Sequence, residues 1–334
     1  MAAGLAVPAF LVGTVVSLLT SFLLVSRLER VGERIGLSEA LLGMVAALAA
    51  DSPEVTAAVT AIAHHQQRVG AGVILGSNVF NLAALLGLGA VVAGRIMLHR
   101  RVILLGGAVA IWIAVTSLFV VAGALPAGAG LALSGAVLAA YLAVLGTEGR
   151  GLERLPVSRR QADWLRSAIA EEELELQQAI RPPRGRWPDV VAAAAALVVV
   201  IVASVTMERA ATALGARYSV PEIVTGAVVL AAVTSLPNAV AAVYLAARGR
   251  GAATLSTALN SNTLNVVVGL LLPATLVGLG QPSAQETVIT VWYVVMTVMV
   301  LALAYRRHGL GRMSGGLIVI AYAAFTASVL LSGW

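Results

Sequence analysis

Long apolar stretches separated by short polar segments follow one another along almost the whole chain. A membrane-spanning helix needs about 20 mostly apolar residues, and ten stretches come close to that length. The pattern therefore predicts an all-α integral membrane protein with ten transmembrane helices. We expect them near residues 5–26, 38–63, 70–94, 102–122, 129–146, 189–207, 221–247, 253–278, 286–305 and 314–332.

The composition agrees with this prediction. Hydrophobic residues make up 59% of the 334 residues and charged residues only 11%, whereas soluble domains carry about 25% charged residues. The chain contains no cysteine, which excludes disulfides and thiolate metal sites. The net charge of +6 comes from arginines in the segments between apolar stretches, so it indicates membrane topology rather than a nucleic-acid partner. We expect the lipid bilayer as the surroundings, no cofactor, and an oligomeric state that the sequence leaves open.

The arginines also predict the orientation. With the N-terminus outside, nineteen of the 22 basic residues fall on the inner side, as the positive-inside rule requires. No basic residue precedes the first apolar run, which favours an uncleaved first span over a secretory signal. We therefore expect a multi-pass protein of the cell (inner) membrane with its N-terminus outside.

One hydrophilic segment, 147–188, interrupts the apolar pattern. It divides the chain into two transmembrane halves, 1–146 and 189–334, and the predicted orientation makes it a cytoplasmic loop. The segment contains an acidic run at 170–176. Charge runs are usually solvated helix faces, so we expect a linker helix, with a regulatory cation site as the alternative.

Two polar motifs repeat inside apolar sequence. Asp51-Ser52-Pro53-Glu54 precedes Gly76-Ser77-Asn78-Val79-Phe80-Asn81, and Thr234-Ser235-Leu236-Pro237-Asn238 precedes Asn260-Ser261-Asn262-Thr263-Leu264-Asn265; in both copies 28 residues separate the proline from the last asparagine. The copies begin on predicted spans two and seven, so they cross the membrane in opposite directions. Such inverted repeats, here about 38–94 and 221–278, are typical of secondary transporters.

The repeated residues have chemistry suited to cations. Each proline removes a backbone donor and leaves a carbonyl of the preceding turn free, and carbonyl, hydroxyl and carboxylate oxygens suit Na⁺ or Ca²⁺. Ser77 and Asn81, like Ser261 and Asn265, are four residues apart and so share a helix face. Both faces are expected to line one cavity in the middle of the membrane.

Asp51 and Glu54 are the acids that we expect inside an apolar span. Their spacing of three residues places them on one helical face. A buried carboxylate without a counter-charge is costly, and no arginine is expected at that depth. A bound cation or a proton is the natural partner, and the alternative is a protonated carboxylate that serves only helix packing.

These motifs resemble the calcium/cation antiporter superfamily, and specifically its sodium/calcium exchanger branch. Gly76-Ser77-Asn78-Val79-Phe80-Asn81 matches the second element of that family's repeat completely, and Ser52-Pro53-Glu54 matches the first in part. The resemblance implies exchange of Ca²⁺ for Na⁺ by alternating access at a mid-membrane site. The ligands that it implies, taken with their motif neighbours, are Asp51, Ser52, Glu54, Ser77, Asn78, Asn81, Thr234, Ser235, Asn238, Ser261, Asn262 and Asn265.

The second repeat departs from the family pattern. Asn238 stands where the family usually has a glutamate, and Asp51 stands where a hydroxyl residue is usual. We hypothesise that Asp51 restores the negative charge lost at Asn238. Ten residues separate Gly43 from Pro53, but eleven separate Gly226 from Pro237, which leaves the register of residues 50–52 open by one position.

Other functions are weighed against this one. A cation/proton antiporter on the same fold would use the same carboxylates to carry H⁺, and a degenerate relative with altered selectivity would bind ions without exchanging them. An intramembrane enzyme is not expected. An aspartyl protease needs acids on two helices, whereas Asp51 and Glu54 share one, and the four histidines all lie in predicted loops.

Overall fold

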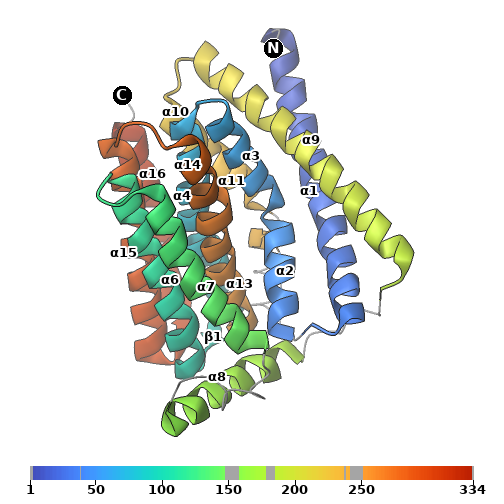
Figure 1. The fold of residues 1–334 in the computed structure, drawn as a ribbon. Helices are drawn as coiled ribbons and strands as arrows, with labels where there is room; N and C mark the ends of the chain where they lie inside the picture. The colour runs from blue at the N-terminus through green and yellow to red at the C-terminus, as the bar shows by residue number, and fades with distance from the viewer. Residues whose placement is uncertain are drawn as a thin grey trace.

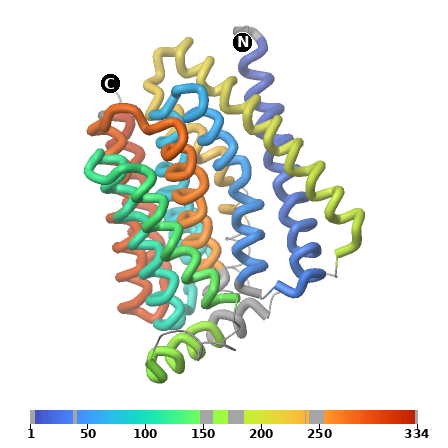
Figure 2. The backbone as a smooth tube through the Cα atoms, viewed as in Figure 1, coloured from blue at the N-terminus to red at the C-terminus, as the bar shows by residue number. Residues whose placement is uncertain are grey.

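The computed structural model describes residues 3–37, 39–146, 158–177, 185–236, 238–240 and 251–332, and almost all of them are helical. Most long helices run roughly alongside one another in a bundle, with α1 and α9 crossing at one side (Figure 1). The tube view shows α8 lying across the lower end of this bundle (Figure 2). The side chains of residues 39, 40, 171–177, 251–253 and both extreme ends lie outside the described part.

The first half begins with a long helix and continues through a bent pair, a helix that contains a π-helical turn, and two further helices. Their bounds are α1 Ala3–Ile35, α2 Glu39–Ala50, α3 Ser52–Ala63, α4 Gln67–Asn81, η1 Leu82–Leu88, α5 Gly89–Ala93, β1 Arg95–Met97, α6 Arg100–Val121 and α7 Ala127–Gly146. The connecting helix α8 spans Arg159–Gln177.

The long helices of the second half follow the same order, but its strand comes one helix later. Its elements are α9 Trp187–Arg217, α10 Glu222–Val224, η3 Thr225–Leu230, α11 Ala231–Thr234, α13 Gly251–Leu264, η4 Asn265–Leu271, α14 Leu272–Val277, α15 Ala284–Arg307, β2 Gly309–Gly311 and α16 Arg312–Ser332. The starts of α1, α4 and α6 recur 184 residues later in α9, α13 and α15, and the end of α5 recurs in α14. The duplication seen in the motifs therefore extends to the whole half.

Within the described residues, eight helices are long and apolar enough to cross a membrane, and the bent pair α2–α3 raises the number to nine. In place of the span predicted over 221–247, the structure describes a shorter apolar helix, Glu222–Thr234. Residues 237 and 241–250, which would complete that span, lie outside the described residues. The chain is thus an all-helical, multi-pass membrane protein, and the count of ten stays a prediction.

The predicted span 38–63 is broken in its middle. Helices α2 and α3 meet at Asp51 with a bend of 55°, and Pro53 lies in the first turn of α3. Because proline has no N–H, the carbonyl of Ala49 loses its helical donor. The Ser52 hydroxyl donates to the Ala49 oxygen at 2.6 Å, so a side chain replaces the missing backbone donor at the break.

The two halves interlock through these polar helices. Helix α4 packs against η3 and α11, while α13 and η4 pack against α2 and α3. The contact of α4 with η3 depends on glycines, because a Cβ on Gly76 would lie 2.3 Å from the carbonyl oxygen of Ala227. Small residues allow membrane helices to approach this closely. The motifs of both halves are thereby brought to the centre of one core.

The arginine-rich connections gather at one end of the bundle. Strands β1 and β2 pair antiparallel there and join the connections that carry Arg95 and Arg312. At the other end, Arg209 of α9 contacts the ring of His64. Helices α1 and α9 are longer than the predicted spans 5–26 and 189–207, so several arginines that we expected in loops extend these helices instead.

Candidate ion-binding site

The twelve candidate residues are all buried, with exposed fractions of 9% or less. They come from the break between α2 and α3, the ends of α4 and α13, the end of α11, the start of η4, and residue 238. Pro237, whose effect on the second break was part of the prediction, lies outside the described residues.

Asp51 lies at the break itself and accepts hydrogen bonds from the second half of the chain. The Asn238 amide donates to its Oδ1 at 2.6 Å. The Ser261 hydroxyl lies 2.6 Å from Oδ1 and 2.7 Å from Oδ2. Both donors come from elements more than 180 residues away in the sequence, so this carboxylate joins the two halves.

Glu54 has the same kinds of donor. The Ser235 hydroxyl donates to its Oε1 at 2.6 Å, and the Asn265 amide donates to its Oε2 at 2.6 Å. Each carboxylate therefore receives one serine hydroxyl and one asparagine amide from the second half. The Ser77 hydroxyl of the first half also lies within hydrogen-bonding reach of Glu54.

Two of these contacts are equivalent under the repeat. With an offset of 184 residues, Glu54 corresponds to Asn238 and Asp51 corresponds to Ser235. The bond from Ser235 to Glu54 and the bond from Asn238 to Asp51 therefore join the same two positions, each at 2.6 Å. In the first bond the carboxylate stands at position 54, which is equivalent to 238. In the second bond it stands at position 51, which is equivalent to 235.

A π-helical segment accounts for the open register before the break. The second half has one more residue between Gly226 and Pro237 than the first half has between Gly43 and Pro53. Segment η3, Thr225–Leu230, is π-helical, whereas α2 is regular. A π-turn accommodates one extra residue within a helix. The offset of 184 therefore holds after this turn, and it pairs Asp51 with Ser235.

Asn78 and Asn262, which are also 184 residues apart, hold the centre together. The Asn78 amide donates to the backbone oxygen of Asn262 at 3.1 Å, and the Asn262 amide donates to the backbone oxygen of Asn78 at 2.9 Å. Reciprocal bonds between equivalent residues are expected where a two-fold relation passes between them. These two asparagines use their amide hydrogens to fix the helices.

The asparagines that end the motifs carry oxygens without a partner. Asn81 donates to Asn262 Oδ1 at 3.2 Å, and the equivalent Asn265 donates to Asn78 Oδ1 at 3.3 Å. Among the described residues, the side-chain oxygens of both Asn81 and Asn265 accept no hydrogen bond although both are buried. An unsatisfied buried acceptor costs about 1–3 kcal/mol. A cation would satisfy both oxygens.

Several predicted hydroxyl ligands are turned back to their own helices. Ser52 donates to Ala49, Ser77 donates to the Ile74 carbonyl at 3.0 Å, and Thr234 donates to the Leu230 carbonyl at 2.9 Å. A hydroxyl that donates its hydrogen still has lone pairs for a cation. Ser77 and Thr234 keep this capacity next to the site, whereas Ser52 corresponds to Leu236 in the second repeat.

The site holds two acidic side chains and no described base. The ion pairs of the described residues join Arg27 and Arg30 to Asp189, and Arg166 to Asp163. The same part of the chain holds no group of three or more His, Cys, Asp or Glu residues that would bind a metal. Two carboxylates with hydroxyl and amide oxygens form a set of hard ligands that suits a transported alkali or alkaline-earth cation.

Three further acids are buried that sequence reasoning did not assign to the membrane core. Glu208 and Asp189 lie at opposite ends of α9, and Glu286 lies in the first turn of α15. We expected only Asp51 and Glu54 inside apolar spans, and Glu208 contradicts this because α9 continues past the predicted end at 207 to Arg217. Asp189 and Glu286 are the first residues of the predicted spans 189–207 and 286–305, and the structure buries them at the helix starts. The Ser283-x-x-Glu286 pattern before an apolar run was the available signal.

Comparison with known proteins places these features in a family. The profile of the sodium/calcium exchanger protein family matches residues 5–147 and 189–331, which is most of the chain and both halves. The chain is also 30% identical over 158 residues to the sodium/potassium/calcium exchanger Nckx30C of Drosophila melanogaster. That match covers 45% of this chain but only 18% of the fly protein.

Solved structures share the fold. The sodium-calcium exchanger NCX_Mj, soaked with zero Na⁺ and Ca²⁺, superposes with a TM-score of 0.57 and 21% identity over 97% of this chain and 99% of its own. The H⁺/Ca²⁺ exchanger CAX superposes with a TM-score of 0.70 and 13% identity over 98% of this chain and 86% of its own. At these identities the similarity establishes the architecture only.

Proposed function

This chain belongs to the sodium/calcium exchanger protein family, and from that membership we propose that it is a secondary active antiporter. It exchanges Ca²⁺, or a related cation, for Na⁺ at one site in the middle of the membrane. The cations are its cargo, and no catalytic chemistry is proposed. The twelve candidate residues form or support the binding site.

One observation carries the proposal. Two carboxylates of the first half, Asp51 and Glu54, are fully buried and meet donors of the second half at 2.6 Å. Two amide oxygens, those of Asn81 and Asn265, accept no hydrogen bond in the same core. A charge of −2 balances one Ca²⁺ or two Na⁺, and the free oxygens complete a coordination shell.

The proposed mechanism is alternating access with competition. Ca²⁺ and Na⁺ would use overlapping ligands, so that they cannot occupy the site together. The empty site would leave two carboxylates unbalanced in a dry interior, and such charges are costly there. Reorientation of the empty protein would therefore be disfavoured, and each half-cycle would require a bound ion. This coupling is what makes the transport an exchange.

The proposed topology has ten spans in two inverted five-helix halves, 1–146 and 189–334. The N-terminus lies outside, and residues 147–188 form a cytoplasmic loop of a protein in the inner membrane. Support comes from the arginine distribution and from the pairing of β1 with β2, which brings two arginine-rich connections to one end. The acidic run of the loop has side chains outside the described residues, and we propose a linker role for it.

Reconstitution tests the function directly. Purified protein in proteoliposomes is loaded with Na⁺, and ⁴⁵Ca²⁺ uptake is followed when external Na⁺ is removed. We expect uptake that collapses when the Na⁺ gradient is dissipated by an ionophore. Separate runs with imposed H⁺ and K⁺ gradients identify the coupling ion. Ca²⁺ uptake that ignores the Na⁺ gradient contradicts the proposal.

A proton-coupled exchange is the second candidate, because both carboxylates lie in one helical turn. Like charges at this spacing repel, and a proton on one of them relieves the repulsion. Uptake driven by a pH gradient alone would establish this alternative. Ion binding in the absence of any gradient-driven flux would instead identify a degenerate relative.

A further inference from the structure

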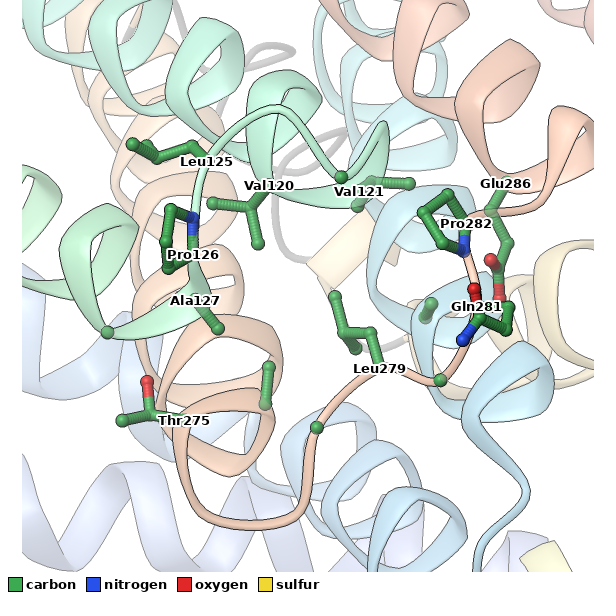
Figure 3. Close-up of a pocket in the computed structure, with 16 residues that line it drawn as sticks. Val120, Val121, Leu125, Pro126, Ala127, Thr275, Leu279, Gln281, Pro282 and Glu286 are labelled. Atoms are coloured by element: carbon green, nitrogen blue, oxygen red, sulfur yellow. The ribbon is translucent and has the colours of Figure 1, made fainter.

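A cavity opens at the end of the bundle that carries His64, away from the arginine-rich connections. Its volume is about 500 Å³, and the loops 122–126 and 278–282 form much of its wall. Figure 3 shows these loops with the Glu286 side chain turned toward the segment of Gln281 and Pro282. Since a water molecule takes about 30 Å³ in the liquid, the cavity has room for a hydrated ion.

Glu286 is the charged residue that lines this cavity, and it is only 4% exposed. It takes part in none of the ion pairs of the described residues. Its position, three residues after Ser283 at the start of α15, would suit a capping box, but the cap has no side-chain hydrogen bond there. Glu286 therefore serves neither as an ion-pair partner among the described residues nor as part of a capping box.

One base and one acid lie within electrostatic reach of Glu286. They are Arg68 at the start of α4 and Glu222 at the start of α10, and both are exposed and lie outside the cavity lining. Glu286 is therefore the source of negative charge in the cavity wall itself. A loop that holds two glycines at positive φ, Gly278 and Gly280, lines the same cavity as Glu286.

The cavity lies in line with the central site. Ala71 of α4 forms part of its wall, and Asn78 lies seven residues along the same helix face, which is about 10 Å. Ile74 and Leu75, both fully buried, occupy the turn between them. A cation held at Glu286 would thus be separated from the central asparagines by two turns of one helix.

We propose that Glu286 forms an outer recruitment site for hydrated Na⁺ and Ca²⁺ ahead of the central site. This inference rests on the proposed exchange function and on the N-terminus being outside. A single carboxylate in a roomy cavity would hold an ion through its water shell, because Ca²⁺ without water needs six to eight oxygens. The site would raise the local cation concentration and would not select between ions.

Sided transport kinetics test the recruitment site. In Glu286→Gln, we expect the half-saturating Ca²⁺ concentration at the outer face to rise about three- to tenfold, since one focused charge contributes on this scale. The maximal rate and the half-saturation at the inner face should stay within about twofold of the parent. Glu222→Gln is the matched control, because Glu222 is an exposed acid at the same end, and it should change little.

A change at both faces, or none at either face, overturns the proposal. An equal effect at the two faces would mean that Glu286 acts through the structure of α15. The inner-face measurement on the same variant also shows that the protein is folded. Failure of the parent protein to exchange Ca²⁺ under any gradient would instead refute the proposed function.

A labelling experiment reads the cavity without transport. The chain has no cysteine, so Gln281→Cys creates a single thiol in the exposed part of the wall. We compare its reaction rates with a cationic and an anionic methanethiosulfonate. The ratio of cationic to anionic rate should fall about three- to tenfold when Glu286→Gln is added, and external Ca²⁺ should lower it only in the parent. An unchanged ratio refutes the site.

Discussion

The two halves of the chain share one backbone plan but not one charge distribution. The starts of α1, α4 and α6 recur 184 residues later, and Asn78 and Asn262 hydrogen-bond each other reciprocally. At the break, however, the first half carries Asp51 and Glu54 where the second carries Ser235 and Asn238. The repeat keeps the asparagines that hold the helices together, and it differs at two positions of the proposed ion site.

This difference shows that charge can move within a repeated site without changing its contacts. The Ser235–Glu54 and Asn238–Asp51 bonds join equivalent positions at the same distance of 2.6 Å. In each bond a carboxylate accepts from a neutral donor, but the carboxylate is at position 54 in one bond and at position 51 in the other.

The largest effect is expected from neutralising either carboxylate. Asp51→Asn and Glu54→Gln each remove one of the two charges that balance Ca²⁺. A charge in a membrane interior is worth about 2.5–3.5 kcal/mol, which corresponds to roughly a 100-fold change in affinity. Each variant should raise the half-saturating Ca²⁺ concentration in proteoliposomes at least that far. Exchange by Asp51→Asn at the parent's rate and affinity would disprove the compensating role of Asp51.

Moving the charge back sharpens this test. The double variant Asp51→Ser with Asn238→Glu puts the carboxylate at the position where the resemblance expects it, and it keeps a charge of −2. We expect it to recover at least about tenfold of the affinity lost in Asp51→Ser alone, because the pair at positions 51 and 238 would then hold one hydroxyl and one carboxylate, as the equivalent Ser235–Glu54 pair does. A double variant that is no better than the single one would show that the two positions are not interchangeable.

The next largest effect separates the two equivalent asparagines. Asn265 donates to Glu54 at 2.6 Å, whereas Asn81 donates to the neutral Ser261 and Asn262 at 3.3 and 3.2 Å. Hydrogen bonds to charged groups contribute about 1.5–3 kcal/mol and neutral ones about 1 kcal/mol. Asn265→Ala should therefore reduce Ca²⁺ affinity about tenfold more than Asn81→Ala. Equal losses would indicate that both residues act only through their free oxygens.

Much of this organisation follows from the sequence. The span predicted over 253–278 is observed at 251–277 with its π-helical turn, and the break at Asp51 follows from Pro53, because proline removes a backbone donor. The family membership was also indicated by the residues of the two motifs. These features are local, so periodicity and single residues are sufficient to reveal them.

Other features depend on contacts that sequence patterns do not contain. The register at Asp51 required the π-helical turn η3, which has no reliable signature in one sequence. The turning of Ser52 toward Ala49 depends on which carbonyl the proline leaves free. The burial of Glu286 depends on loops far apart in the chain. Such three-dimensional relations decide how these polar residues are paired and buried.

A smaller effect, on stability rather than on ions, concerns the close contact of α4. Its Gly76 meets the backbone of Ala227, while the equivalent position in α13 is Asn260. Gly76→Ala should destabilise the protein by about 1–3 kcal/mol, as overpacking does. We expect a lower thermal unfolding midpoint in detergent. Gly135→Ala is the matched control, because a Cβ there meets no atom within 4 Å, and a similar loss in both variants would contradict the close-contact explanation.

The smallest effect on ion affinity is expected at Ser52. Its hydroxyl is bonded to the Ala49 carbonyl at 2.6 Å, and its equivalent is the apolar Leu236. Ser52→Ala should cost stability, since a buried carbonyl without a donor costs about 1–3 kcal/mol, but it should change the half-saturating Ca²⁺ concentration less than about twofold. Ser261→Ala provides the contrast, because that hydroxyl contacts both Asp51 oxygens. A large affinity loss in Ser52→Ala, matching that in Ser261→Ala, would make Ser52 a ligand and would extend the ion site beyond the positions that the repeat relates.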